Sequence, residues 1–301
     1  MTIHRQGGFS NAARVLNRTQ PAISRRIKLL EAELGAPLFE RVARGPALSQ
    51  AGRALVPYAE RVLAAVKDAQ DAVRALTSET AGPVALAAVG TLAGIPLTAI
   101  LKRFTTRHRD VELGLRTATS REVSELVRQG EATIGLRYGG DPSPDLDSDI
   151  LAVEPLVVVC ASDHPLAGRS IRRLAQLRTA RWLAFPEAPG RPEAAASHIF
   201  GLFKALGLGE VDWTPVDSLT AQKRLVEAGM GLALLAASGV TEELAAGSLS
   251  LINVKDLRAG QEIAAVTRKG GFLSAAARDL LASLRAGFKG QSASQSRRRG
   301  R

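Results

Sequence analysis

The sequence predicts an α/β chain that begins with a small helical unit and a long helix. Three observations support this. Two short helical patterns with a polar turn between them lie between Phe9 and Gly35. An unbroken apolar repeat with spacings of four and three then runs from Gln50 to about Ser78. Beyond Pro83, short apolar runs alternate with helical patterns, which is typical of layered α/β folds.

Composition excludes several classes of protein. With 301 residues, 46% of them hydrophobic, the chain is long enough for two or three domains with real cores. No apolar run approaches the ~18–20 residues of a membrane helix, and no cleavable leader is present, so we expect a cytoplasmic protein that does not bind membranes. The one cysteine, Cys160, excludes an internal disulfide framework and fits a reducing compartment.

The basic charge lies at the two ends of the chain, whose net charge is +11. Residues 1–78 contain 12 Lys/Arg and 6 Asp/Glu, and residues 291–301 contain four arginines and no acid. Basic charge concentrated on the N-terminal region points to phosphate contacts there rather than to nonspecific binding of polyanions by the whole chain. Residues 290–301 are expected to form a basic, disordered tail.

The stretch from Phe9 to Gly35 predicts a helix-turn-helix. Ser10 is expected to cap the first helix, and Thr19 the second, which has Pro21 in its first turn. One stripe of the second helix is apolar and is expected to be buried: Ile23, Ile27, Leu30 and Leu34. The opposite face is polar and basic, as a helix entering a major groove requires; it carries Gln20, Ser24, Arg25 and Lys28.

Residues 1–49 are expected to form one winged helix-turn-helix that binds DNA. The turn-rich segment around Gly45 is interpreted as a wing, with Arg41 and Arg44 beside it holding phosphates together with Ser10. The alternative is a surface loop with ordinary arginines. Only residues 1–8 precede the pair of helices, with Ile3 as the one residue left to pack, so the first helix is expected to be incomplete.

Residues 50–78 predict a linker helix that pairs with a second copy. Its apolar seam keeps the a/d spacing of a coiled coil over about three heptads and consists of Leu55, Ala59, Val62, Val66, Ala69, Val73 and Leu76. The alternative is a monomeric helix that packs on the rest of its own chain. A dimer is favoured because two copies can read two half-sites.

After a hinge at 79–83, strands and helices alternate. The expected strands are Val84–Val89, Val111–Arg116, Thr133–Arg137, Leu156–Ala161, Trp182–Phe185, Val211–Val216, Gly231–Leu235 and Ile263–Thr267. The expected helices lie near 92–105, 120–129, 193–206, 218–229 and 274–287.

The N-terminal region resembles LysR-type transcriptional regulators. The matching residues are Gly7, Phe9, Ala12, Ala13, Gln20 to Ser24, Ile27, Leu30, Glu31, Leu34, Gly35, Pro37 to Arg41, Leu48, Ala51 and Gly52. The resemblance implies an effector-binding domain at 83–289, built from two subdomains like those of periplasmic binding proteins. These would be residues 83–154 with 258–289, and residues 155–257, with crossing strands near Leu151–Pro155 and Val254–Leu257.

Small polar residues follow several predicted strands. Because open α/β sheets bind ligands at the carboxyl ends of their strands, we expect an effector site there. Its candidate residues are Gly90, Thr91, Thr119, Ser120, Phe185 and Ser218. Hydroxyl and N–H groups at helix N-termini suit a small anion such as a carboxylate, and the resemblance supports this. The alternative is that Ser120 and Ser218 are only helix caps.

Catalytic and metal sites are not expected. The four histidines, which are His4, His108, His164 and His198, are scattered without metal-ligand spacing. Cys160 lies in an apolar run and is interpreted as a small core residue. Motifs for a nucleophilic serine, a phosphate loop or a dinucleotide are missing. We therefore expect no enzyme activity and no cofactor.

Taken together, these observations predict a sequence-specific DNA-binding transcriptional regulator. Its expected partners are double-stranded operator DNA, a small-molecule effector that is a small anion or organic acid, and further copies of itself in a homodimer or homotetramer. The alternative is a small-molecule-binding α/β protein whose truncated DNA-binding module does not function.

Overall fold

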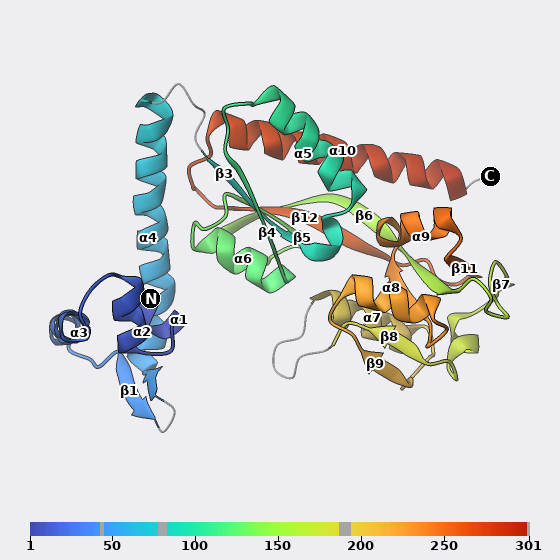
Figure 1. The fold of residues 1–301 in the computed structure, drawn as a ribbon, viewed down its shortest axis with the longest axis horizontal. Helices are drawn as coiled ribbons and strands as arrows, with labels where there is room; N and C mark the ends of the chain where they lie inside the picture. Colours follow the sequence, from blue (N-terminus) through green and yellow to red (C-terminus); the bar gives the residue numbers. More distant parts are fainter. Residues whose placement is uncertain (43–44, 78–82, 187–193, 300–301) are drawn as a thin grey trace. The chain divides into compact units, whose positions relative to one another are not determined.

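The computed structural model describes residues 1–42, 45–77, 83–186 and 194–299 (Figure 1). The chain forms two compact units, Met1–Ala69 and Gln70–Arg301. Each unit has its own buried apolar cluster. Within the described residues, no helix combines the length and the apolar composition needed to cross a membrane.

The first unit contains three short helices, a hairpin and most of a long helix. In order these are α1 (Thr2–Arg5), α2 (Phe9–Val15), α3 (Gln20–Leu34), β1 (Phe39–Val42), β2 (Gly45–Leu48) and α4 (Gln50–Thr77). Asn17 adopts a positive φ of 50° in the turn between α2 and α3. The Thr19 side-chain oxygen accepts the Ala22 N–H at 3.4 Å, which confirms the cap expected for the second helix.

Ser10 does not cap α2, contrary to expectation. The helix begins one residue earlier, at Phe9, with Gly8 as its N-cap and no side-chain cap bond. Gly7 adopts a positive φ of 68°, and this turn brings the chain into the helix before Ser10 is reached. Ser10 is therefore an exposed residue of the first turn.

The apolar stripe of α3 is buried only in its first half. Ile23 is buried in a cluster with Ile3, Ala12 and Ala13, against which Phe9, Ile27 and Phe39 pack. Leu30 and Leu34 are 38% and 47% exposed, so the expectation of one continuous buried stripe was wrong. The cluster draws only Ile3 from α1, which is a single turn long, and no described residue of the cluster covers the second half of α3.

The helix α4 spans 28 residues and contains Pro57. Its first half packs closely at Gly52, where an added Cβ would lie 2.2 Å from the Leu38 carbonyl oxygen. Most of the predicted seam is on the surface: Val62, Val66 and Val73 are 62%, 52% and 59% exposed. Ala69 is also exposed, whereas Leu55 and Ala59 are half-buried. Leu76 belongs to the helix, but its side chain lies outside the described part.

The second unit is built on a sheet with the strand order β4-β3-β5-β12-β6-β11-β7, in which β10 also pairs with β6. Its strands are β3 (Val84–Val89), β4 (Leu113–Ala118), β5 (Ile134–Tyr138), β6 (Leu146–Ala161), β7 (Ser170–Ile171), β10 (Ala233–Ala236), β11 (Leu249–Val254) and β12 (Gly260–Arg268). A separate parallel pair consists of β8 (Trp182–Ala184) and β9 (Trp213–Pro215).

The helices of the second unit lie on the faces of these strands (Figure 1). They are η1 (Gly90–Leu92), α5 (Ile95–Arg107), α6 (Ser120–Arg128), η2 (Leu174–Leu177), α7 (Ala194–Ala205), α8 (Leu219–Glu227), η3 (Ala237–Val240), α9 (Thr241–Ala246) and α10 (Ala275–Arg299). The helices α5 and α10 pack together on one face of the sheet, and α6 covers the other.

The strand β6 is shared by two separate cores. Its first part, up to Pro155, pairs with β12, and its second part, from Leu156, pairs with β10 and β11. One core is formed by buried residues between Val84 and Leu151 together with those from Ile263 to Phe288; we call this part of the unit the first lobe. Buried residues from Leu156 to Leu257 form the core of the second lobe.

Several elements differ from the sequence-based expectations. β3 matches its predicted range. β6 joins the crossing strand expected near Leu151–Pro155 to the strand expected at Leu156–Ala161, and it begins at Leu146, five residues before that crossing strand. β7 and α9 were not predicted, and the crossing strand expected near Val254–Leu257 was wrong, because β11 ends at Val254 and the chain then turns before β12 begins at Gly260. Residues 290–299 continue α10, where a disordered tail was expected. Serine, glutamine and arginine are compatible with a helix, and nothing in this segment breaks it before Gly300.

Candidate nucleic-acid interface and small-molecule site

One face of α3 presents the predicted DNA-contacting residues together. Gln20, Ser24 and Lys28 are spaced by four residues and therefore lie on one side of the helix, and Arg25 lies next to them. Gln20, Arg25 and Lys28 are exposed, and Ser24 is half-buried. The Gln20 Nε2 donates to Ser24 Oγ at 2.9 Å. The helix thus offers hydrogen-bonding groups and positive charge on its exposed surface, away from its buried Ile23.

The start of the hairpin is fastened to α3. The Glu31 carboxylate accepts the backbone N–H groups of Leu38 and Phe39 at 2.7 Å and 3.3 Å. The ring of Phe39 packs edge-on against that of Phe9, with the ring centroids 5.4 Å apart. These contacts fix where the hairpin leaves the helix-turn-helix and hold the start of β1 against α3.

The predicted wing is an antiparallel hairpin of β1 and β2. Its pairing runs from Phe39 opposite Leu48 to Val42 opposite Gly45. The backbone of Arg41 is on β1, and Arg44 lies outside the described residues. Sequence reasoning missed Arg18, which is exposed in the turn before α3. The sequence feature that could have indicated Arg18 is its basic side chain directly before the Thr19 cap.

Of the predicted effector residues, Gly90 and Thr91 lie in η1, directly after β3. The Thr91 hydroxyl donates to the phenol oxygen of Tyr138 at 3.1 Å, and Tyr138 is the last residue of β5. Tyr138 is only 3% exposed. The ends of two neighbouring parallel strands therefore bring two hydroxyl groups together, as expected at the carboxyl edge of such a sheet. Tyr138 itself was not predicted to take part.

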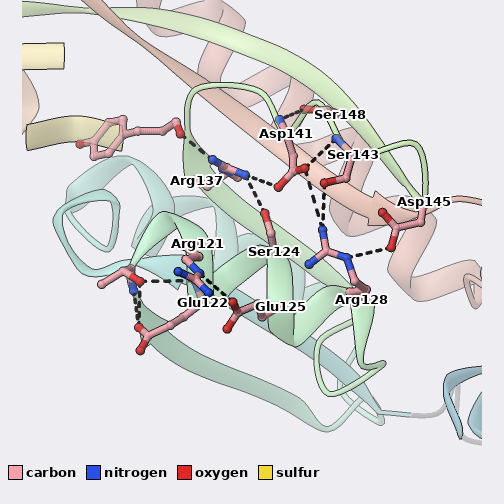
Figure 2. A network of polar contacts seen from close by, with 12 residues as sticks. Arg121, Glu122, Ser124, Glu125, Arg128, Arg137, Asp141, Ser143, Asp145 and Ser148 are labelled. Atoms are coloured by element: carbon pink, nitrogen blue, oxygen red, sulfur yellow. Dashed lines mark hydrogen bonds and ion pairs between the residues drawn. The ribbon is translucent and has the colours of Figure 1, made fainter. Parts of the chain in front are cut away.

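The N-terminus of α6 is capped by Thr119, not by Ser120 as expected. The Thr119 hydroxyl contacts the backbone N–H of Glu122, and the Glu122 carboxylate accepts the Thr119 N–H and hydroxyl, both at 2.9 Å (Figure 2). These bonds from Thr119 lower the pKa of Glu122. Ser120 is the first helical residue and is fully buried. The carboxylate of the chain's own Glu122 therefore already lies at this helix N-terminus.

In the second lobe, the two candidate residues follow the paired strands β8 and β9. Ser218 is exposed and caps α8, where its side-chain oxygen accepts the Ala221 N–H at 3.4 Å. Phe185 is half-buried and follows β8. The helices α6 and α7, one from each lobe, lie close to each other, and His198 Nε2 on α7 lies 3.1 Å from the carbonyl oxygen of Gly260 at the start of β12.

A buried ion-pair network follows β5 (Figure 2). The Arg137 guanidinium bonds to the Ser124 hydroxyl at 2.7 Å and to the Asp141 carboxylate, and both charged side chains are less than a tenth exposed. Burial raises the pKa of Asp141, but hydrogen bonds from Ser124 and Ser143 and the charge of Arg137 outweigh it and lower that pKa to about 2. Arg128 extends the network to Asp145 at 2.8 Å. Sequence reasoning did not find this network.

A second buried carboxylate belongs to Glu154, on β6. It is 6% exposed, and its Oε1 accepts the Ser238 N–H at 2.9 Å. Its Oε2 is buried and has no hydrogen-bond partner among the described residues. Burial is the main cause that raises the pKa of Glu154 above its ordinary value of 4.5.

Glu154→Gln is expected to flatten the pH dependence of stability. Because the pKa is raised in the folded state, the folded protein keeps this proton to a higher pH than the unfolded chain does, and the resulting stabilisation is lost as the pH rises through the folded-state pKa. The variant stays neutral, so its melting temperature should fall less than that of the wild type between about pH 5 and about pH 8. Glu262→Gln, at an exposed position on β12, is the control; parallel melting curves for wild type and Glu154→Gln would refute the expectation.

Cys160 is a buried core residue of the second lobe. Burial and the nearby charge of Asp163 raise the pKa of its thiol to about 11, so it is protonated at neutral pH and a poor nucleophile. Among the residues that the structure describes, no group of three or more His, Cys, Asp or Glu side chains is arranged to hold a metal ion.

Comparisons with known proteins cover nearly the whole chain. Residues 1–53 match the family "Bacterial regulatory helix-turn-helix protein, lysR family", and residues 77–289 match "LysR substrate binding domain". The HTH-type transcriptional regulator CbbR of Rhodospirillum rubrum is 32% identical over 291 residues, which are 94% of this chain and 93% of that protein.

Solved structures share the arrangement. The structure of CbnR, a LysR family transcriptional regulator, matches with a TM-score of 0.65 and 26% sequence identity, and the match covers 96% of both chains. Full-length CbnR complexed with its target DNA is also 26% identical, with a TM-score of 0.63 over 95% of this chain and 96% of that one.

Proposed function

Because this chain belongs to the LysR family of transcriptional regulators, we propose that the exposed face of α3 reads base edges in the major groove of its operator. The observation that carries this is the exposure of Gln20, Arg25 and Lys28 on one side of a capped helix. Ser24 lies among them. Ser10, Arg41 and Arg44 contact phosphates beside this helix and hold its register. Members of the family are regulators and not enzymes, and the chain acts in the cytoplasm, where the DNA is.

Two copies bind the operator together through the seam of α4. The support is the exposure of Val62, Val66 and Val73 along one side of a helix that is 28 residues long. Apolar side chains at heptad spacing on an exposed helix face find their burial in a second helix. The dimer then presents two α3 helices to two half-sites, and two dimers form a tetramer where four sites are used.

The second unit binds a small-molecule effector, which is a small organic acid. Support comes from Gly90 and Thr91 at the carboxyl end of β3, beside the Tyr138 hydroxyl. Thr119 and Ser120 follow β4, which is parallel to β3 and ends at the same edge of the sheet. Phe185 and Ser218 contribute from the second lobe. An effector that binds one arrangement of the lobes better than another shifts their equilibrium, and with it the geometry of the bound dimer.

A second function is a small-molecule-binding protein whose DNA-binding module does not function. The exposure of Leu30 and Leu34 favours it, because an incompletely covered helix-turn-helix core is less stable. A gel shift with DNA from beside its own gene, at several salt concentrations, separates the two functions. Specific binding supports the regulator, and binding to no DNA at any salt concentration supports the second function.

Arg25→Ala is expected to weaken specific operator binding by about 1–3 kcal/mol, because a guanidinium that reads a base edge discriminates by that amount. The matched control is Arg26→Ala, which removes the same charge from the next exposed position, about 100° round the helix. Its loss should be smaller and equal for operator and random DNA. Equal operator affinities for Arg25→Ala and wild type in a gel shift would remove Arg25 from the base contacts.

A further inference from the structure

The connecting segment between α3 and β1, residues 35–38, is bonded to α3 on one side. Glu31 lies in the last turn of α3, and its Oε1 accepts the N–H groups of Leu38 at 2.7 Å and Phe39 at 3.3 Å. The Glu31 carbonyl oxygen accepts the Ala36 N–H at 3.2 Å, and Gly35, with a φ of 68°, caps the helix. Glu31 therefore ends α3 with its main chain and holds the connecting segment with its side chain.

The connecting segment is bonded to α4 on the other side. The Leu38 carbonyl oxygen accepts the Ser49 N–H at 3.0 Å, and the Pro37 carbonyl oxygen accepts from the Ser49 hydroxyl. Ser49 also caps α4, because its Oγ accepts the Gly52 N–H at 3.0 Å, and it is 8% exposed. An added Cβ at Gly52 would lie 2.2 Å from the Leu38 carbonyl oxygen, so the first turn of α4 packs directly on the connecting segment.

The helix-turn-helix also contacts α4 beyond Pro57. Arg5 of α1 and Glu60 of α4 form an ion pair at 4.0 Å, and Ala64, one turn later, is fully buried. The contacts between α4 and the rest of its unit therefore lie on both sides of the proline. That unit, Met1–Ala69, includes most of the α4 seam as well as α3.

The bonds to Glu31 and Ser49 limit the rotation of α3 relative to α4. Only residues 35–37 lie between Leu34, where α3 ends, and Leu38, and Pro37 among them has a restricted φ. Both the N–H and the carbonyl oxygen of Leu38 are occupied, one by each side of the joint. Because a rotation would break these bonds, α3 keeps one orientation relative to α4.

A fixed orientation matters for a dimer that reads two half-sites. Moving one half-site by two base pairs shifts it by about 7 Å along the DNA and turns it by about 70° around the axis. A dimer whose α3 helices are each fixed to the paired α4 helices cannot follow this displacement without losing one half-site. If the connecting segment is released, the second α3 can reach a displaced half-site.

We propose that Glu31 and Ser49 are positioning residues that determine which spacing of half-sites the regulator accepts. They act through the backbone of residues 37–39, and neither belongs to the residues assigned above to base or phosphate contacts. The inference rests on the proposed function, since it takes α3 as the helix that enters the groove and α4 as the helix that pairs the two copies.

The test measures the affinity of the full chain for DNA with different half-site spacings. The probes are the operator found by gel shift beside its own gene, the same operator with two base pairs added or removed between the half-sites, and a duplex with one half-site. The wild type should lose at least about tenfold in affinity when the spacing changes, because the geometry then forbids simultaneous binding at both half-sites. In Glu31→Ala and in Ser49→Ala this loss should shrink to about threefold or less, with binding to the single half-site retained.

Conservative variants separate positioning from a general loss of stability. Glu31→Gln keeps an oxygen that can accept both N–H groups, and Ser49→Thr keeps the hydroxyl, so both should restore the spacing preference of the wild type. Glu33→Ala is the matched control, because it removes the same charge from an exposed position of α3, and it should retain the preference.

The inference is overturned if Glu31→Ala and Ser49→Ala both keep the spacing preference of the wild type. It is also overturned if both variants lose binding to the single half-site, because the two residues then maintain the fold of the helix-turn-helix rather than its orientation. Equal relaxation of the preference in Glu33→Ala and Glu31→Ala would assign the effect to charge and not to the connecting segment.

The proposed function fails in a different way. A wild type that binds neither the operator nor its half-site specifically at any salt concentration refutes the proposed DNA reading, and the inference falls with it. A wild type that binds the operator specifically, but with equal affinity at every spacing, overturns only the inference.

Discussion

Asp141→Asn is expected to destabilise the Gln70–Arg301 unit by about 2–3 kcal/mol at neutral pH. The carboxylate is the buried partner of Arg137, and asparagine leaves that cation without its counter-charge. In a unit of this size the loss corresponds to a fall of about 5–10 °C in melting temperature.

The pH dependence of this effect follows from the pKa. Because the pKa of Asp141 is lowered from 3.8 to about 2, its contribution is complete above the unfolded value and is lost as the pH falls towards 2. The difference between wild type and Asp141→Asn should therefore shrink between about pH 4 and about pH 2. No such convergence is expected for changes that only disturb packing.

Tryptophan fluorescence measures this transition selectively, because Trp182 and Trp213 both lie in the Gln70–Arg301 unit. Asp147→Asn is the control, since it makes the same chemical change at an exposed position on β6. Its melting temperature should match that of the wild type. If the melting temperature of Asp141→Asn equals that of the control, the ion pair does not stabilise the fold.

Val62→Glu combined with Val66→Glu is expected to separate the dimer into monomers. Both side chains are more than half exposed in one chain and occupy neighbouring positions of the seam. In a coiled coil, each glutamate would lie against its counterpart in an apolar interface, where buried like charges are strongly unfavourable. Operator affinity should fall by a factor on the order of 10²–10⁴, because the second half-site is no longer bound by a tethered partner.

Sedimentation of the full chain measures the first effect and a gel shift the second. The control carries Ala54→Glu and Ala75→Glu, which add the same charge at exposed positions of α4 away from the seam. It should remain dimeric. If the Val62 and Val66 variant also sediments as a dimer, the copies associate through another surface.

The sequence predicted correctly those elements whose formation depends on residues that are close together in the chain. The strand β3 is an apolar run between Pro83 and Gly90, and its bounds were predicted correctly. The cap at Thr19 follows from the side chain alone. The first residues of β6 were missed because Asp147 and Asp149 resemble loop residues, and the crossing strand near Leu151–Pro155 was expected only from the family resemblance, since Pro155 resembles a strand breaker. Pairing with β12 stabilises these residues in the strand, and no local sequence pattern reveals that pairing.

In the candidate site too, the features that depend on local sequence were predicted and those that depend on tertiary pairing were not. Gly90 and Thr91 were predicted from their place after a strand, and Thr91 does meet another hydroxyl there. The burial of Tyr138 and Glu154, on the strands that flank β12, depends on the register of β12 between them, and that register is decided by tertiary pairing. Likewise, Leu30 and Leu34 have helical spacing, yet their burial depends on what packs against α3.

The placement of β12 also determines the order in which the protein can be built. This strand is central to the sheet of the first lobe, yet a ribosome synthesises it only after the entire second lobe. The second lobe is continuous in sequence and can close its core while translation continues. Until β12 is synthesised, β5 and the first part of β6 each have an unpaired backbone edge. The protein is therefore most prone to aggregation while its first lobe is incomplete.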